Sequence, residues 1–247
     1  MLLTVVLSLL IADTQASTNS PLHRLDDLGA AEAFVDSGDV AVVGFFENKD
    51  AHGYNEFLAA AAEVKSIPVA VCSNKEVWEK YNVTSDTISI FRKADLHQEN
   101  LQLSKAKTVD IDGLKRFITM YSIRYITEYN QMTAVGLFKS GVKTHLLLFT
   151  NRGSGEYRKL KEQLATLAPE FTGKFLFVLI DGEEKSNDRS LDYFGLKPRD
   201  LPRVGIYDGH SDRKWLMSEG EISTDRVRSF CQSFLDRILQ VFFRFEW

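Results

Sequence analysis

The sequence has only two cysteines among its 247 residues, Cys72 and Cys231, and no Cys-x-x-Cys pair. A thiol–disulfide enzyme needs a poised thiolate and usually a resolving thiol two residues away. The chain is therefore predicted not to be an enzyme of that class. Cys72 closes a strand-like apolar run and Cys231 lies in a helical apolar stripe, so both are expected to be core residues rather than a disulfide.

Other signatures of catalysis and cofactor binding are missing as well. The five histidines form no His-Glu-x-x-His motif, and no phosphate-binding Gly-rich loop or Gly-x-Ser-x-Gly is present. We therefore expect no metal site and no cofactor. The formal net charge of −4 gives no electrostatic reason to expect a nucleic-acid partner.

Long apolar runs are absent except at the N-terminus. Residues 1–12 are apolar but too few to cross a bilayer as a helix, and small or polar residues follow up to Ala16. We expect 1–16 to be a signal peptide, although a buried N-terminal strand or helix is an open alternative. No membrane span is expected in the mature protein. In the secretory pathway Asn82, in Asn82-Val83-Thr84, would be a glycosylation acceptor.

The rest of the chain is globular in composition, with 44% hydrophobic and 26% charged residues. Its first half alternates helix-like and strand-like patterns. Helices are expected over 25–35, 54–65, 75–81 and 110–121, and strands over 40–46, 67–72, 87–92 and 100–104. The alternation of polar and apolar residues over 87–92 predicts a half-buried strand.

The second half repeats this order. Strands are expected over 125–127, 144–149, 175–180, 204–207 and around Trp215, and helices over 154–168, 190–194 and from Ser223 or Thr224 onward. The last helix should bury a stripe at Val227, Phe230, Cys231, Phe234, Leu235 and Ile238.

Two copies of one unit predict an α/β protein with two tandem thioredoxin-like domains, each a mixed sheet flanked by helices. The domains are expected over 22–123 and 124–241, with a tail over 242–247. In the thioredoxin fold a cis proline precedes the strand after the third helix, and Pro202 after Leu201 stands at that place.

Several segments resemble the non-catalytic middle domains of the protein disulfide isomerase family. The resemblance lies in 71–77, 90–92 and 126–130, and more closely in 143–149, 173–181 and 193–197. It covers essentially everything after the signal peptide. The first domain is similar to the b type of that family and the second to the b′ type.

The resemblance implies a redox-inactive chaperone or adaptor of the endoplasmic reticulum lumen that binds unfolded polypeptides. In the family, a shallow apolar pocket of the second middle domain receives hydrophobic side chains. The positions matching that pocket are Leu148, Thr150, Leu164 and Val178. Leu164→Asp is then expected to abolish binding while leaving the fold intact.

The resemblance also implies recruitment of the 57-kDa thiol oxidoreductase that works with calnexin and calreticulin. The matching loop surrounds Trp215 and includes Asp212, Arg213 and Lys214. Arg213 and Lys214 are basic where the family pattern is acidic, and an acidic loop docks by charge complementarity.

The printed sequence ends in Phe245-Glu246-Trp247 rather than in a Lys-Asp-Glu-Leu-type retention signal. Either this is an alternative or incomplete form, or the protein would be secreted unless a partner holds it. Two other functions stay open for such a fold. One is a calsequestrin-like calcium-binding protein, for which −4 is a low charge, and the other is a glutathione-binding enzyme.

Overall fold

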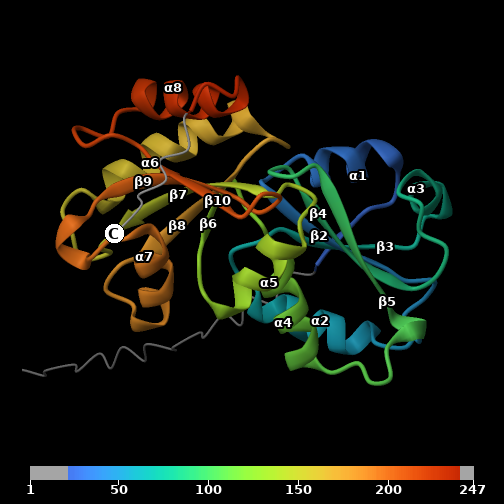
Figure 1. The fold of residues 1–247 in the computed structure, drawn as a ribbon. Coiled ribbons are helices and arrows are strands. Elements are labelled where there is room, and N and C mark those ends of the chain that lie inside the picture. Colours follow the sequence, from blue (N-terminus) through green and yellow to red (C-terminus); the bar gives the residue numbers. More distant parts are fainter. Residues whose placement is uncertain (1–21, 240–247) are drawn as a thin grey trace, which may run out of the picture.

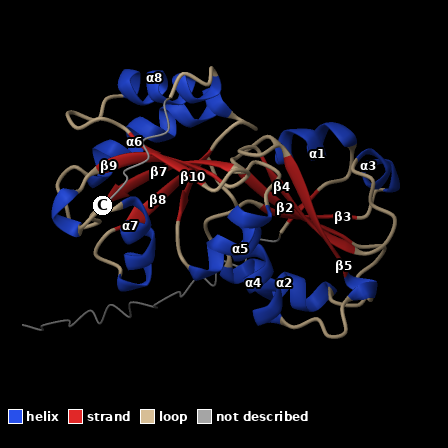
Figure 2. Ribbon diagram, viewed as in Figure 1, coloured by secondary structure: helices blue, strands red, loops and turns tan. Residues whose placement is uncertain are grey.

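The computed structural model describes residues 22–239 as two five-stranded sheets, each with helices on both faces (Figures 1 and 2). The expected signal peptide, most of it apolar, and the tail over 242–247 lie outside the described residues. No helix within 22–239 is long and apolar enough to cross a membrane.

The first sheet has the strand order β1-β3-β2-β4-β5, with β4 antiparallel to its neighbours. Its strands are β1 (His23–Arg24), β2 (Val40–Phe45), β3 (Val69–Cys72), β4 (Thr87–Arg92) and β5 (His97–Gln102). Its helices are α1 (Leu28–Val35), α2 (Tyr54–Glu63), α3 (Lys75–Lys80) and α4 (Ile111–Tyr121).

The second sheet has the order β6-β8-β7-β9-β10, which is the same topology shifted by five strands. Its strands are β6 (Ile126–Glu128), β7 (Thr144–Thr150), β8 (Leu176–Asp181), β9 (Arg203–Asp208) and β10 (Arg213–Leu216). Its helices are α5 (Gln131–Lys139), α6 (Tyr157–Leu167), α7 (Asp188–Phe194) and α8 (Thr224–Leu235). The repeat confirms the predicted fold class, two tandem thioredoxin-like units. The Leu201–Pro202 peptide bond, before β9, is cis.

Local capping explains where several helices begin. The expected first helix was too long, because the Asp27 side chain accepts a hydrogen bond from the Ala30 backbone and makes Leu28 the first helical residue. Helix α5 was missed altogether, although Asn130 and Thr133 form a capping box at its start.

Two burial expectations were wrong. Strand β4 is buried on both faces, not half-buried, because helices cover both sides of the sheet; even Ser89 and Arg92 are enclosed. Ile238 is 67% exposed, because α8 ends at Leu235 and the stripe ends with it.

The two units are packed against each other through α4 and α5, which lie side by side in Figure 1. The turn between β4 and β5 also reaches into the second unit. Ala94 is buried in that unit's core, and its carbonyl accepts a hydrogen bond from the Gly173 backbone. The side chains of Arg92 and Asp95 form a buried ion pair of 2.8 Å, and the Ser140 hydroxyl donates to Asp95 at 2.7 Å.

Candidate functional site

The four residues expected to form the apolar pocket do not come together in the structure. Leu148 and Leu164 belong to the core under α6 and α8, and Thr150 shares the strand face of Leu148. Val178 faces the opposite side of the sheet, toward α5 and α7. The resemblance matched strands and helices correctly but not sheet faces, because neighbouring strand residues point to opposite sides.

An apolar cavity of about 310 Å³ lies on that opposite face, between α5 and α7. Val178 belongs to its wall, and so does Leu147, the strand neighbour of Leu148. The other lining residues are mostly apolar or aromatic: Tyr129, Leu137, Phe138, His145, Ile180, Arg189, Ser190, Tyr193, Phe194, Tyr207 and Asp212. Such a cavity can receive a bulky apolar side chain.

Large apolar side chains at this cavity reach solvent. Phe138 on α5 is 54% exposed and Tyr193 on α7 is 37% exposed. The tyrosine ring stacks edge-on against Phe194 and Tyr207. Exposed aromatic groups beside an apolar cavity are typical of a surface that binds another molecule.

One carboxylate orders the polar side of the cavity. Asp212 Oδ1 accepts hydrogen bonds from the hydroxyls of Tyr193 and Tyr207, each at 3.2 Å. Burial raises the pKa of both phenols, and the charge of Asp212 raises it further. The Lys214 Nζ atom lies over the Tyr193 ring, 4.3 Å from its centroid, and donates a hydrogen bond to the Tyr193 carbonyl.

His145 is the most deeply buried titratable group of the cavity. Its side chain lies between the rings of Phe138 and Tyr207 and is 5% exposed. Burial, helped by the positive charge of Lys143, lowers its pKa to about 4, so the imidazole is neutral at neutral pH. Its Nε2 atom has no hydrogen-bond partner among the described residues.

Sequence reasoning missed Phe138, His145 and the two tyrosines because α5 was not recognised. The repeat itself held the signal: α1 is the helix of the first unit that corresponds to α5, and Asn130-x-x-Thr133 is a capping pattern. Recognising that helix would have directed attention to the face of the sheet that it covers.

The residues expected to bind a partner form the tip and second strand of the β9–β10 hairpin. Asp212 lies in the turn, Arg213 and Lys214 are the first residues of β10, and all three are exposed. Trp215 is only partly exposed, because its ring packs edge-on against Phe234 in the core under α8. The tryptophan is thus chiefly a packing residue of β10, and the charged tip is the accessible part.

The positions at which thioredoxin enzymes carry their reactive thiol hold no sulfur here. The loop after β2 contains Glu47, Asn48 and Lys49, and the loop after β7 contains Asn151 and Arg152. Arg152 pairs with Glu128 at 2.6 Å. Burial alone would raise the pKa of Glu128, but hydrogen bonds from Lys161 and Tyr157 lower it overall.

Neither cysteine belongs to those loops, although Cys72 at the end of β3 lines a small cavity together with Glu47, Asn48 and Lys49. Cys72 and Cys231 are both free and buried, one in the core under α1 and α3 and the other in the core under α8. Burial raises the pKa of both thiols, that of Cys231 to about 12. A protonated thiol in a core is a poor nucleophile.

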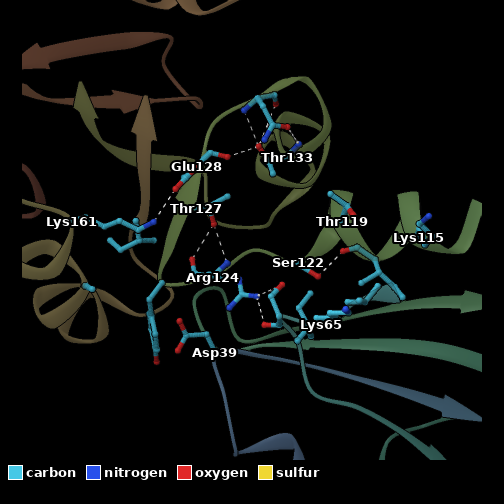
Figure 3. Close-up of a pocket in the computed structure, with 18 of the residues that line it drawn as sticks. Asp39, Lys65, Lys115, Thr119, Ser122, Arg124, Thr127, Glu128, Thr133 and Lys161 are labelled. Carbon is cyan, nitrogen blue, oxygen red and sulfur yellow. Dashed lines mark hydrogen bonds and ion pairs between the residues drawn. The ribbon is translucent and has the colours of Figure 1, made fainter. Parts of the chain in front are cut away.

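A larger cavity of about 980 Å³ opens between the two units, next to α4, β6 and α6 (Figure 3). Its walls carry charges of both signs, including Lys65, Lys115 and Glu128. Arg124 bridges it by donating to the Ser66 carbonyl at 2.7 Å. Lys115 pairs with Glu63 and Glu128 pairs with Lys161, so part of this charge is already neutralised within the chain.

Two further expectations concern the surface. Asn82 is exposed in the turn after α3, where a glycan would have room. Within residues 22–239 no three carboxylate, histidine or cysteine side chains are grouped so as to hold a metal ion.

Comparison with known proteins agrees with this architecture. The thioredoxin-like domain family matches residues 46–233. The chain is 33% identical over 229 residues to endoplasmic reticulum resident protein 27 of Bos taurus, covering 91% of this chain and 84% of the relative. Against the Homo sapiens protein of that name it is 34% identical over 211 residues, covering 85% and 77%.

The similarity extends to a catalytic relative and a solved fragment. Protein disulfide-isomerase of Gallus gallus is 33% identical over 220 residues, which cover 89% of this chain but 42% of that enzyme. A crystal structure described as the bb fragment of ERp72 covers 89% of this chain and 98% of the fragment, at 16% identity and a TM-score of 0.44.

The molecule is thus a protein of two thioredoxin-like units with cysteine-free loops at the usual thiol positions. It belongs to the protein disulfide isomerase family, in the group of endoplasmic reticulum resident protein 27. This confirms the resemblance and the expected location in the endoplasmic reticulum.

Proposed function

We propose that the chain is a redox-inactive folding accessory that binds apolar side chains of non-native polypeptides in the α5–α7 cavity. The observation that carries this proposal is the cavity itself, about 310 Å³ in volume and walled by Leu147, Val178 and aromatic rings. Folded proteins bury such side chains, so an apolar receptor selects chains that are not folded.

The form of the cavity fits weak and sequence-tolerant binding. Phe138 and Tyr193 offer apolar contact area at its rim, and Arg189 and Asp212 add charges of both signs. Apolar contacts are non-directional and scale with the area buried, so different side chains can bind without an exact fit. A folding accessory needs this tolerance because its clients differ in sequence.

The proposed lack of redox activity depends on both cysteines. Neither Cys72 nor Cys231 lies in the loops after β2 and β7, and both thiols are enclosed. The fold would then bind polypeptides without catalysing thiol–disulfide exchange.

Substitution at the rim tests the binding site without disturbing the core. In Phe138→Ser a mostly exposed ring is lost, so the fold should persist while the affinity for a fluorescently labelled unfolded protein falls several-fold. Fluorescence anisotropy measures that affinity. Leu96→Ser is the matched control, because Leu96 is 75% exposed and belongs to the first unit. Equal affinity of the two variants would count against the site.

From the sequence, Leu164→Asp was expected to abolish binding and leave the fold intact. The burial of Leu164 predicts instead that this substitution destabilises the fold. Leu164 is 4% exposed in the core under α8, and a carboxylate there has no partner. Loss of binding in this variant would report unfolding and not the loss of a contact.

Recruitment of a thiol oxidoreductase is a second proposal, supported by the exposed tip of the β9–β10 hairpin. The positive charges of Arg213 and Lys214 would favour docking on an acidic surface of the partner. Trp215 is less accessible, because its ring packs against Phe234. A pull-down of the 57-kDa oxidoreductase with wild type and Arg213→Glu tests it. Loss of capture with the variant supports docking through the tip; equal capture refutes it.

The two alternative functions have direct assays. Calcium titration followed by calorimetry tests calsequestrin-like binding, for which residues 22–239 offer no cluster of three ligands. Titration with glutathione tests the enzyme alternative, for which the loop at Asn151 and Arg152 is the position to change.

A further inference from the structure

Strand β6 borders the cavity between the two units along its free edge. It is the outermost strand of the second sheet and pairs with β8 on its other side. Every residue from 124 to 128 lines the cavity of about 980 Å³, and Figure 3 shows Thr127 and Glu128 beside it. Neighbouring side chains of a strand point to opposite faces, so this unbroken contact means that the edge of the strand meets the cavity.

The phase of the β6–β8 pairing shows which backbone groups point into the cavity. The Tyr129 N–H donates to the Leu179 carbonyl of β8 at 2.8 Å. In a parallel pair, alternate residues bond to the neighbouring strand, so Thr127 and Tyr129 are directed to β8. The backbone groups of Ile126 and Glu128 are therefore directed to the cavity.

Three of these four outward groups have no partner within the described part of the chain. The Glu128 carbonyl accepts a hydrogen bond from the Thr133 hydroxyl at 2.7 Å. The Ile126 N–H, the Ile126 carbonyl and the Glu128 N–H accept or donate none there. An open strand edge of this kind is a template for pairing with another chain.

The surroundings of the edge restrict what can pair with it. Strand β6 has only three residues and lies between the units, where Ser66 and Ile67 of the first unit and Ala165 of α6 are also wall residues. A second folded sheet is too bulky for that space. A single extended segment fits, since the cavity is at the large end of ligand pockets.

The lining of the cavity carries one net positive charge. Two of its lysines are neutralised, because Lys115 pairs with Glu63 and Lys161 pairs with Glu128. Arg124 donates only to the uncharged oxygen atoms of Ser66. The complete charged lining consists of Lys65, Lys115, Arg124 and Lys161 against Asp39, Glu63 and Glu128. This balance favours a guest that carries negative charge.

We propose that the inter-unit cavity is a second polypeptide site, in which an extended acidic segment pairs with β6 as an added strand. Main-chain hydrogen bonds to Ile126 and Glu128 would supply affinity without regard to sequence, and a carboxylate of the guest would face Arg124. The inference rests on the proposed function for the source of the segment: folded chains have paired their backbone groups, whereas non-native chains have not.

Backbone methylation of the guest tests strand pairing. The probe is a short fluorescent peptide of alternating valine and threonine around a central glutamate, titrated with the full chain by fluorescence anisotropy. A form that is N-methylated at every residue keeps the side chains and the charge but has no donor, and it should bind roughly tenfold more weakly. A form methylated at every second residue keeps one free edge and should bind like the unmodified peptide. Equal affinity of all three forms would overturn the proposal, and so would a loss as large in the one-edge form.

Amide hydrogen exchange locates the pairing on the protein. With saturating unmodified peptide, NMR should show slower exchange at the Ile126 and Glu128 amides. The amide of Arg24 is the matched control, because β1 is the corresponding edge strand of the first unit. Slowing at Arg24 alone, or at none of the three amides, would overturn the assignment to β6.

A charge reversal of the same logic tests the acidic preference. Replacing the central glutamate of the peptide by glutamine should weaken binding roughly threefold, and Arg124→Gln should abolish that difference. Arg116→Gln is the matched control, because Arg116 is exposed on α4 and does not line the cavity. A glutamate preference that survives in Arg124→Gln would overturn the role of Arg124.

The α5–α7 cavity is tested separately by Phe138→Ser. The probe peptide has no aromatic residue, so this substitution should leave its binding unchanged while it weakens binding of an unfolded protein. If the peptide failed to bind but the effect of Phe138→Ser on unfolded protein remained, the β6 site would be refuted and the proposed function would stand. Binding of the peptide without any effect of Phe138→Ser on unfolded protein would refute the α5–α7 site instead.

Discussion

Gly136 on α5 packs directly against the backbone carbonyl of Met120 on α4, across the junction of the two units. A β-carbon added to Gly136 on α5 would lie 2.1 Å from the carbonyl oxygen of Met120 on α4. Only glycine lets the two helices pack at this distance, since any other residue places an atom inside the Met120 backbone. This contact fixes the position of α5, which forms one wall of the apolar cavity.

Gly136→Ala is therefore expected to destabilise the protein by about 1–3 kcal/mol, although alanine favours a helix. The two helices must separate, and binding at the cavity should weaken as α5 shifts. Urea unfolding measures the stability. Gly141→Ala is the control, because a β-carbon there has nothing within 4 Å, and it should change stability by less than about 0.5 kcal/mol. Similar effects of both substitutions would contradict the close-packing argument.

The buried ion pair of Arg92 and Asp95 predicts a large loss on removal of one partner. Asp95 also accepts the hydrogen bond from Ser140 of the second unit, so its loss leaves an unpaired buried guanidinium at the junction. Asp95→Ala should cost about 3–5 kcal/mol in the free energy of unfolding.

The exposed pair of Glu170 and Arg228 serves as the comparison for Asp95. Both of its side chains are about half exposed, so Glu170→Ala should cost less than about 1 kcal/mol. Chemical denaturation of both variants checks the difference. Comparable losses would show that burial does not set the strength of the Arg92–Asp95 pair.

The lowered pKa of His145 predicts that acid destabilises the fold. The unfolded chain takes up the proton near the usual pKa of 6.5, whereas the folded chain takes it up only near 4. The unfolded state therefore binds more protons between these values, and stability falls as the pH falls through that window.

Between pH 7.5 and 5 this one group should account for a loss of about 2 kcal/mol. Denaturant unfolding of wild type and His145→Leu at both pH values isolates it, because the variant retains every other titrating group. The expected result is a steeper acid loss for wild type. Parallel pH profiles would show that the imidazole is not buried neutral.

Cys72 and Cys231 should react slowly with a thiol reagent until the protein unfolds. Both are enclosed, and burial raises the pKa of both thiols, so little thiolate forms and the reagent has no access. A chromogenic disulfide reagent should detect close to no thiol in buffer and both thiols in denaturant. Rapid reaction of one thiol in buffer would refute its place in the core.

The sequence was informative where pattern and local chemistry act together. The continuous apolar run over 175–180 predicted the buried strand β8, and the doubled order of elements predicted two thioredoxin-like units. It was less informative about β4, whose polar residues suggested a solvent-facing side. The helices on that side come from distant segments, so no local pattern reports their presence.

What the sequence determined by itself was the class of fold, the family and the absence of sulfur from the loops after β2 and β7. These depend on residue identity, order and short-range periodicity. The tertiary structure alone decided which sheet face carries the cavity. Leu148 and Leu147 are adjacent in sequence and similar in chemistry, yet only Leu147 lines the cavity. The choice between them is made by α5 and α7, which pack on one face and leave room there for His145 and the aromatic rings.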